Sequence, residues 1–193
     1  MDVRWRKTDN YKKSILSYLH DFVILLVVIL IVFLFIGRIV VVSGPSMMDT
    51  LIDGDYLLVL GKPFYHSPQA GDVVVVSKDG FKSGEPIIKR VIATEGQTVQ
   101  IIGNEVYVDG QLLNEPYIST LTSAPYGNQY SCVVQKGYVF VMGDNRAVSK
   151  DSRSNEIGQI DCREIIGKAL FLFLPGSDEI TKERDFHRIG GIY

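Results

Sequence analysis

The sequence is poor in the side chains that bind metals or cross-link small domains. Its 193 residues include 2 cysteines and 3 histidines. The histidines His20, His66 and His187 are scattered, and no two of them stand at metal-ligand spacing with a cysteine or a carboxylate. We therefore expect no metal site.

A phosphate-binding loop, a large charge imbalance and an internal repeat are also missing. The stretch Gly44-Pro45-Ser46 is followed by a strand pattern and not by the helix whose N-terminus would hold a phosphate. The 20 basic and 22 acidic residues give a net charge of -2, which does not favour nucleic acid as a partner. The missing repeats and heptads exclude solenoids and coiled coils. We expect one folded domain, with no cofactor and no nucleic acid.

One long apolar run is present, near the N-terminus. Every residue from Phe22 to Ile36 is apolar, which gives about 15 residues or ~22 Å of helix, short for a full membrane span. Gly37 can extend it, and Arg38 can place its charge among the headgroups. A cleavable export signal and a buried core helix are the alternatives. Because no small-residue cleavage site follows, we expect an anchor in the lipid membrane.

Basic residues lie mostly before this run. They are Arg4, Arg6, Lys7, Lys12 and Lys13. Since only Arg38 follows the run, the N-terminus is expected in the cytoplasm and the remainder outside, as in a single-pass protein of the cell membrane. The expected organisation is a cytoplasmic basic N-terminus at 1–20, a transmembrane helix at 21–38, an extracytoplasmic β-rich domain at 39–175 and a loose polar tail at 176–193.

The region after the apolar run has the pattern of an antiparallel β-protein. Short runs of Val, Ile and Tyr alternate with Gly, Pro, Asn and Asp. The expected strands are Ile39–Val42, Tyr56–Leu60, Asp72–Ser77, Ile87–Thr94, Thr98–Ile102, Glu105–Val108, Tyr138–Met142 and Ile165–Leu174. Turn dipeptides at Gly103-Asn104 and Asp109-Gly110 predict a β-meander. Residues 114–135 have no sustained period and are expected to be a long connection or an insert.

Ser46 follows a tight Gly-Pro turn, where a hydroxyl can be exposed. A serine is a poor nucleophile unless a neighbouring base removes its proton. No pairing of a histidine with a carboxylate is indicated, so the remaining candidate base is a lysine. An ordinary turn residue is the alternative reading of Ser46.

Lys89 is the candidate base. In a strand, its side chain shares a face with Ile87 and Val91. Burial on such an apolar face lowers the pKa of a lysine, so that the neutral amine can accept a proton near physiological pH. The alternative is an ordinary solvated strand lysine, which spacing alone leaves open.

Three motifs in this order resemble type I signal peptidase of the Gram-positive-like bacterial kind, over about residues 39–175. They are the Ser46 motif Gly44-Pro45-Ser46-Met47-Met48 after the apolar run, Ile88-Lys89-Arg90-Val91-Ile92, and Gly143-Asp144-Asn145-Arg146 with Ser149, Asp151, Ser152 and Arg153. The resemblance implies a barrel-like catalytic domain, mainly β, and a membrane-bound serine endopeptidase. Such an enzyme removes signal peptides from secretory preproteins through an acyl-enzyme.

The resemblance also implies roles for single residues. Ser46 attacks the peptide carbonyl, Lys89 takes and returns the proton, and the Ser149 hydroxyl orients the lysine amine. A structural ion-pair network is implied for three further residues, for which a solvated polar loop is the alternative. They are Arg146, Asp151 and Arg153.

Two positions depart from the usual pattern. Many relatives carry a hydroxyl residue at Gly44 that helps to hold the oxyanion. The oxyanion region therefore has the backbone of Gly44 and Ser46, with a second donor from water or from Ser43. Asp49 stands where the family normally has proline.

Pockets for small substrate side chains are expected near Ser46. The residues that could wall them are Val42, Met47, Leu51 and Ile88, which are equally ordinary core residues. A disulfide between Cys132 and Cys162 is permitted outside the cytoplasm, and two free thiols are the alternative.

Two other functions compete with signal peptidase activity. A self-cleaving Ser-Lys repressor would share the dyad but is soluble, so the apolar run argues against it. A catalytically weak or inactive membrane-anchored relative, acting as a binding or assembly module, is the second. The presence of both Ser46 and Lys89 argues against that reading.

Overall fold

The computed structural model describes residues 15–30, 37–48, 50–77, 85–125, 127, 129–178 and 181–192. The chain separates into two compact units, Met1–Gly37 and Arg38–Tyr193. Each unit is described by itself.

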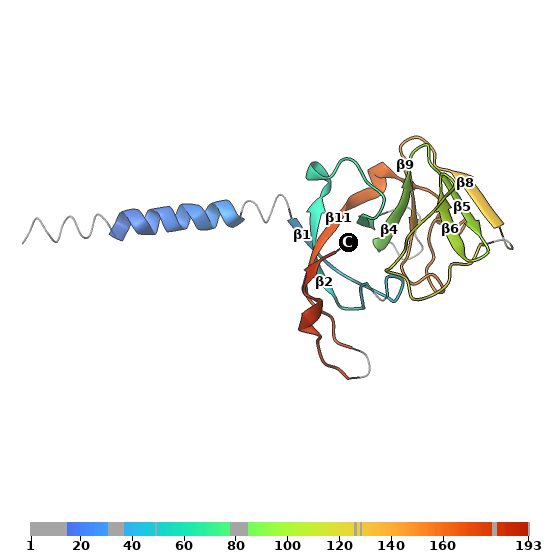
Figure 1. Cartoon of the computed structure of the whole chain (residues 1–193). Helices are drawn as coiled ribbons and strands as arrows, with labels where there is room; N and C mark the ends of the chain where they lie inside the picture. Colours follow the sequence, from blue (N-terminus) through green and yellow to red (C-terminus); the bar gives the residue numbers. More distant parts are fainter. Residues whose placement is uncertain are drawn as a thin grey trace, which may run out of the picture. The chain divides into compact units, whose positions relative to one another are not determined.

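The first unit contains a helix over residues 15–30 (Figure 1). Its large apolar side chains are exposed, from 45% for Ile29 to 75% for Tyr18. In the described ranges, no helix is both long and apolar enough to cross a membrane. Residues 31–36 of the expected span and residues 1–14 of the expected cytoplasmic N-terminus lie outside the described residues.

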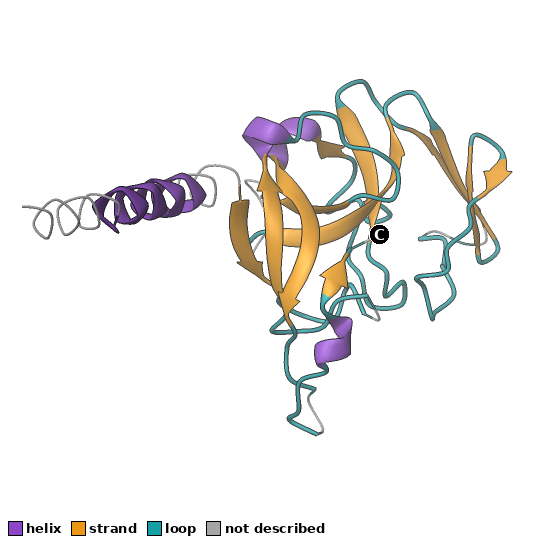
Figure 2. Ribbon diagram, turned by 60° about the vertical axis from the view of Figure 1, so that its left-hand side comes forward, coloured by secondary structure: helices purple, strands orange, loops and turns teal. Residues whose placement is uncertain are grey.

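The second unit is mainly β, with a curled antiparallel sheet (Figure 2). The larger sheet has the strand order β1-β2-β11-β3-β4-β9-β10, and β12 pairs with β11. Its strands are β1 Gly37–Val41, β2 Tyr56–Gly61, β3 Val73–Val76, β4 Ile87–Thr94, β9 Tyr138–Met142, β10 Ile160–Asp161, β11 Ile165–Leu174 and β12 Gly190–Gly191. The smaller sheet has the order β7-β6-β5-β8. Its strands are β5 Thr98–Ile102, β6 Glu105–Val108, β7 Gln111–Leu112 and β8 Gln129–Val133.

The strands with strong apolar patterns were predicted correctly. β4, β5, β6, β9 and β11 have the expected bounds, and β1, β2 and β3 differ from them by one or two residues. The predicted meander is confirmed, because β6 pairs with both β5 and β7. Asp109 and Gly110 at its second turn have φ of 52° and 78°, the left-handed values that two-residue hairpin turns require.

The segment 114–135, expected to be a connection or an insert, contains a strand that the sequence did not predict. Its residues Gln129–Val133 form β8, which pairs with β5 from Ile102↔Gln129 to Thr98↔Val133. The side chains of β8 alternate between exposed and half-buried. Because the strand has no fully buried face, its own sequence carries only a weak strand signal.

The C-terminal segment is also ordered in its described part, so the expected loose tail is wrong. A short 3-10 helix, η3 Phe186–Arg188, precedes β12. β12 pairs with β11 at Phe171↔Gly191 and Leu172↔Gly190, and Arg188 forms an ion pair with the buried Asp55. These long-range partners hold a segment that is too polar to form a core of its own.

The centre of the larger sheet is closely packed around Gly167 of β11. A Cβ atom at Gly167 would lie 2.1 Å from the Leu60 carbonyl oxygen and 2.9 Å from a Val59 methyl group. We expect Gly167→Ala to lower the free energy of unfolding by about 1 to 3 kcal/mol, because the neighbouring backbone must shift. Chemical denaturation measures this change. Gly190→Ala is the matched control, since nothing lies within 4 Å of its Cβ position, and an equal effect of both substitutions would contradict the prediction.

Candidate active site

Ser46 lies in a loop that is closed at its neck by two backbone hydrogen bonds. The Val42 amide donates to the Asp55 carbonyl at 2.9 Å, and the Gly54 amide donates to the Val42 carbonyl at 3.0 Å. Gly44 has φ of 84°, a conformation that favours glycine. The loop, residues 42–55 and hereafter the Ser46 loop, thus presents a half-buried Ser46 from a fixed base.

Lys89 approaches Ser46 from the centre of the larger sheet. It lies on β4, between β3 and β9, and only 3% of it is exposed. Its Nζ atom donates to Ser46 Oγ at 2.7 Å and to the Ile88 carbonyl at 2.9 Å. The two residues that the sequence singled out, 43 positions apart, are therefore in direct contact.

The charge of Lys89 is disfavoured by its surroundings. Burial lowers the pKa of Lys89 from 10.5 to about 8, although the charges of Asp151 and Asp144 act in the opposite direction. A lower pKa means that a larger fraction of the amine is neutral near physiological pH. The amine can then accept a proton from the hydroxyl beside it.

Ser149 lies close to this pair but does not make the expected contact with Lys89. Its Oγ atom is buried and has no hydrogen-bond partner among the described residues. A Cβ atom at Gly143 would lie 2.2 Å from Ser149 Oγ and 2.4 Å from the Ser46 carbonyl oxygen. Glycine at position 143 therefore lets the Ser46 loop and the Ser149 hydroxyl approach each other.

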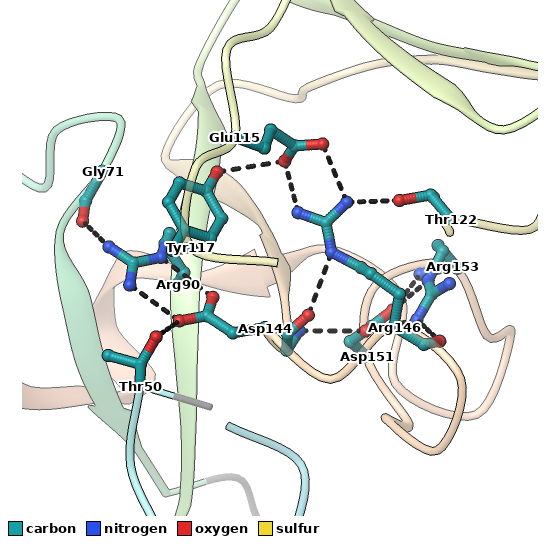
Figure 3. A network of polar contacts seen from close by, with 11 residues as sticks. Thr50, Gly71, Arg90, Glu115, Tyr117, Thr122, Asp144, Arg146, Asp151 and Arg153 are labelled. Atoms are coloured by element: carbon teal, nitrogen blue, oxygen red, sulfur yellow. Dashed lines mark hydrogen bonds and ion pairs between the residues drawn. The ribbon is translucent and has the colours of Figure 1, made fainter. Parts of the chain in front are cut away.

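A buried ion pair supports the loop that follows β9 (Figure 3). Arg90 Nε and Nη2 donate to the two carboxylate oxygens of Asp144 at 2.9 and 2.7 Å. The Thr50 hydroxyl donates to the same carboxylate at 2.5 Å, and the Arg90 guanidinium lies 4.0 Å from the centre of the Tyr117 ring. Arg90, the neighbour of Lys89 on β4, is itself only 1% exposed. The sequence placed Asp144 in a motif but did not predict that it pairs with Arg90.

Two further ion pairs brace the same loop (Figure 3). Asp151 binds Arg153, with Nε donating at 2.8 Å, and also accepts from the Gly143 amide at 3.0 Å. Arg146 forms an ion pair with Glu115. The three residues expected in a network are therefore all paired. Sequence reasoning missed Glu115, because its segment showed no periodicity.

The backbone amides of Gly44 and Ser46 were expected to face the oxyanion, but the Gly44 amide is bound to another group. The Gly44 amide is already used, since it donates to Asp53 Oδ1 at 2.8 Å. Asn145 holds the backbone on the other side of Ser46: its amide donates to the Ser46 carbonyl at 3.1 Å and its Nδ2 to the Pro45 carbonyl at 3.2 Å. Asp49 lies outside the described residues.

A cleft of about 670 Å³ opens beside the Ser46 loop. It is lined by Ser43, Gly44, Pro45, Met48, Ile52, Asp53, Ser177 and Asp178. The four expected pocket residues are not among these. They lie instead in one core cluster with 1 to 7% exposure, namely Val42, Met47, Leu51 and Ile88.

No cluster suited to a metal ion is found in the described part of the chain. There, no group of three or more His, Cys, Asp or Glu side chains is arranged to hold a metal. Cys132 and Cys162 are both free thiols and half-buried.

This chain is similar to known proteins over most of its length. The family described as signal peptidase, peptidase S26, matches residues 15–174. The probable signal peptidase I-1 of Synechocystis sp. is 40% identical over 159 residues, which cover 79% of each chain. Signal peptidase I of Bacillus licheniformis is 34% identical over 184 residues, covering 91% of this chain and 97% of that protein. The crystal structure of a signal peptidase I from Enterococcus faecalis V583 matches 53% of this chain and 96% of that chain, at 26% identity and a TM-score of 0.44.

The burial of Lys89 can be measured directly. We expect the Cε resonance of Lys89, assigned by comparison with Lys89→Met, to titrate with a pKa of about 8 in the folded protein. In the denatured chain, the same group should titrate near its reference value of about 10.4. Carbon NMR of lysine-labelled protein over a pH series gives both values. A folded-state pKa near the denatured value would show that burial does not lower it.

Proposed function

The chain belongs to the signal peptidase family, peptidase S26, and from this premise we propose that it is a serine endopeptidase that removes signal peptides from secretory preproteins. Ser46 is the nucleophile and Lys89 the general base. The observation that carries this proposal is the 2.7 Å contact between Lys89 Nζ and Ser46 Oγ, made by a buried lysine of lowered pKa.

The proposed reaction begins with neutral Lys89. Its amine takes the proton of the Ser46 hydroxyl as Oγ attacks the carbonyl carbon of the scissile peptide bond. The tetrahedral intermediate collapses to an ester on Ser46, and the lysine ammonium returns the proton to the leaving amine. A water molecule then attacks the ester as Lys89 takes its proton, and Lys89 returns that proton to Ser46 Oγ as the signal peptide leaves with its new carboxylate.

Groups around the dyad have proposed supporting roles. Ser149 is proposed to orient the Lys89 amine during the reaction. It makes no hydrogen bond to Lys89 in this structure, but its buried hydroxyl, which has no partner among the described residues, lies next to the Ser46 backbone. The Ser46 amide stabilises the oxyanion. Because the Gly44 amide is bound to Asp53, the second donor is water or the hydroxyl of Ser43, which lines the cleft.

The substrate side chains next to the cut are proposed to be small. Val42, Met47 and Leu51 belong to the Ser46 loop itself, and together with Ile88 of β4 they lie in one buried apolar cluster. A large substrate side chain placed against these residues would displace core side chains, whereas a small one would not. The role of these four residues as pocket walls stays a prediction.

We also propose that residues 21–38 anchor the enzyme in the membrane, with residues 1–20 in the cytoplasm and the peptidase domain outside. Support comes from the apolar run Phe22 to Ile36 and from the exposed apolar side chains of the helix at 15–30. An anchor confines the enzyme to the surface where preproteins emerge, which raises the effective concentration of substrate.

The dyad is tested by removing either member. We expect Ser46→Ala and Lys89→Met to lower kcat/KM for a preprotein by at least about 1,000-fold, because each removes a group that acts in the chemical step. Matched controls are Ser131→Ala and Lys150→Met at exposed positions, which should keep full activity. Folding of each variant is checked by thermal denaturation. Undiminished cleavage by a folded Ser46→Ala or Lys89→Met variant would refute the dyad.

The pH dependence tests the protonation state of the base. Since only neutral Lys89 accepts the serine proton, kcat/KM should rise with pH through the lysine pKa of about 8 and level off above it. Initial rates of preprotein cleavage from pH 6 to 10 measure the ascending limb. A limb at the value of a solvated lysine, about 10.4, would exclude a buried base.

A further inference from the structure

The described parts of the C-terminal segment, residues 176–178 and 181–192, pack directly on the neck of the Ser46 loop. The Gly176 amide donates to Asp55 Oδ1 at 2.7 Å. A Cβ atom at Gly176 would lie 2.2 Å from the Asp53 carbonyl oxygen and 2.9 Å from the Gly54 carbonyl carbon. The backbone of Gly176 therefore packs directly against the backbone of Asp53 and Gly54, where the two ends of the Ser46 loop meet.

Arg188 fixes this contact through a buried carboxylate. Its Nη1 and Nη2 atoms donate to the two oxygens of Asp55 at 2.9 and 2.7 Å. Asp55 is completely buried and also accepts from the Ile52 amide at 2.8 Å. Because an unpaired buried carboxylate is costly, Arg188 keeps the base of the Ser46 loop and the C-terminal segment together.

Arg188 is also linked to the strand that carries the base. Its Nη2 atom donates to the Thr50 carbonyl at 3.2 Å, and the Thr50 hydroxyl donates to Asp144 at 2.5 Å. Asp144 is the partner of Arg90, the neighbour of Lys89 on β4. Arg188 thus binds Thr50 of the Ser46 loop, and Thr50 is linked through Asp144 to Arg90 of β4, the strand that carries Lys89.

The same segment forms part of the cleft beside the Ser46 loop. One wall of the 670 Å³ cleft comes from the Ser46 loop, including Pro45 next to Ser46, and the other includes Ser177 and Asp178. Figure 1 shows the segment, in red, leaving β11 as a loop and returning to the sheet. The closing contacts of Gly176 and Arg188 therefore set the distance between the two walls.

We propose that the C-terminal segment belongs to the substrate site of this enzyme. Arg188 is a positioning residue that holds the Ser46 loop in register with Lys89. Ser177 and Asp178 form the second wall of a cleft that receives the extended preprotein chain next to the scissile bond. The cleft is lined by Pro45, the residue before the nucleophile, but not by Ser46 or Lys89 themselves. Its lining includes both polar and apolar residues, which suits a peptide chain. This inference rests on the proposed peptidase function.

Arg188 is tested by comparing Arg188→Met with Arg188→Lys in the full chain. The methionine variant should lower kcat/KM for a preprotein by about 10- to 100-fold, because small displacements of a nucleophile have such effects. The lysine variant, which keeps a charge for Asp55, should recover part of this loss. Kinetics are normalised to the folded fraction, measured by denaturation at the assay temperature. If the folded fraction of Arg188→Met has the unsubstituted kcat/KM, Arg188 has only a structural role.

The cleft is tested by filling it without touching the ion pair. Ser177→Trp places a large side chain at an exposed lining position, and Glu183→Trp is the matched control on the same segment, at an exposed position outside the cleft. We expect Ser177→Trp to raise KM by about tenfold with little change in kcat, as for a loss of uniform binding. The control should match the unsubstituted chain.

The two tests separate this inference from the proposed function. Failure of the unsubstituted chain to cleave any preprotein would refute the function itself. Cleavage by the unsubstituted chain together with equal kinetic constants for the two tryptophan variants would refute the cleft alone.

Discussion

A lysine amine accepts a proton near neutral pH only where its ammonium form is disfavoured, and in this protein burial on β4 provides that condition. Lys89 pairs with Val74 of the adjacent β3 and is 3% exposed. The negative charges of Asp144 and Asp151 attract the lysine ammonium and so raise the pKa of Lys89. Each is bound to an arginine of its own. The pKa of Lys89 falls to about 8 because desolvation exceeds the remaining attraction.

The ion pairs also have a geometric role, because the nucleophile and the base lie on different elements. Ser46 is on a loop between β1 and β2, whereas Lys89 is inside the sheet. A contact of 2.7 Å between such elements depends on what holds the loop. Asn145 donates hydrogen bonds to the backbone carbonyls of Pro45 and Ser46. At the base of the loop, the Asp55 carbonyl accepts from the Val42 amide. The loop is therefore fixed next to Ser46 by Asn145, which is far away in the sequence, and at its base by hydrogen bonds between its own two ends.

Prediction from sequence succeeded where a strand carries its own pattern. All four residues of β3 are buried valines. Six consecutive residues of β4 are buried, and apolar residues flank Lys89 and Arg90 on both sides. It failed for β8 and for the C-terminal segment, whose side chains are polar or half-exposed. Their order comes from pairing with β5 and β11 and from Arg188, and none of these partners is near in the chain.

By itself the sequence determined the apolar run at the N-terminus, the β character of the domain and the identity of Ser46 and Lys89 as the pair to examine, because these depend on local composition and on motif order. Only the tertiary structure decided that Lys89 is buried against Ser46, that Arg90 binds Asp144 and that Glu115 binds Arg146. It also decided that Arg188 binds Asp55, which is 133 positions away in the sequence. The physical reason is that the burial of a charge depends on which distant elements pack around it. Periodicity within a segment does not contain that information.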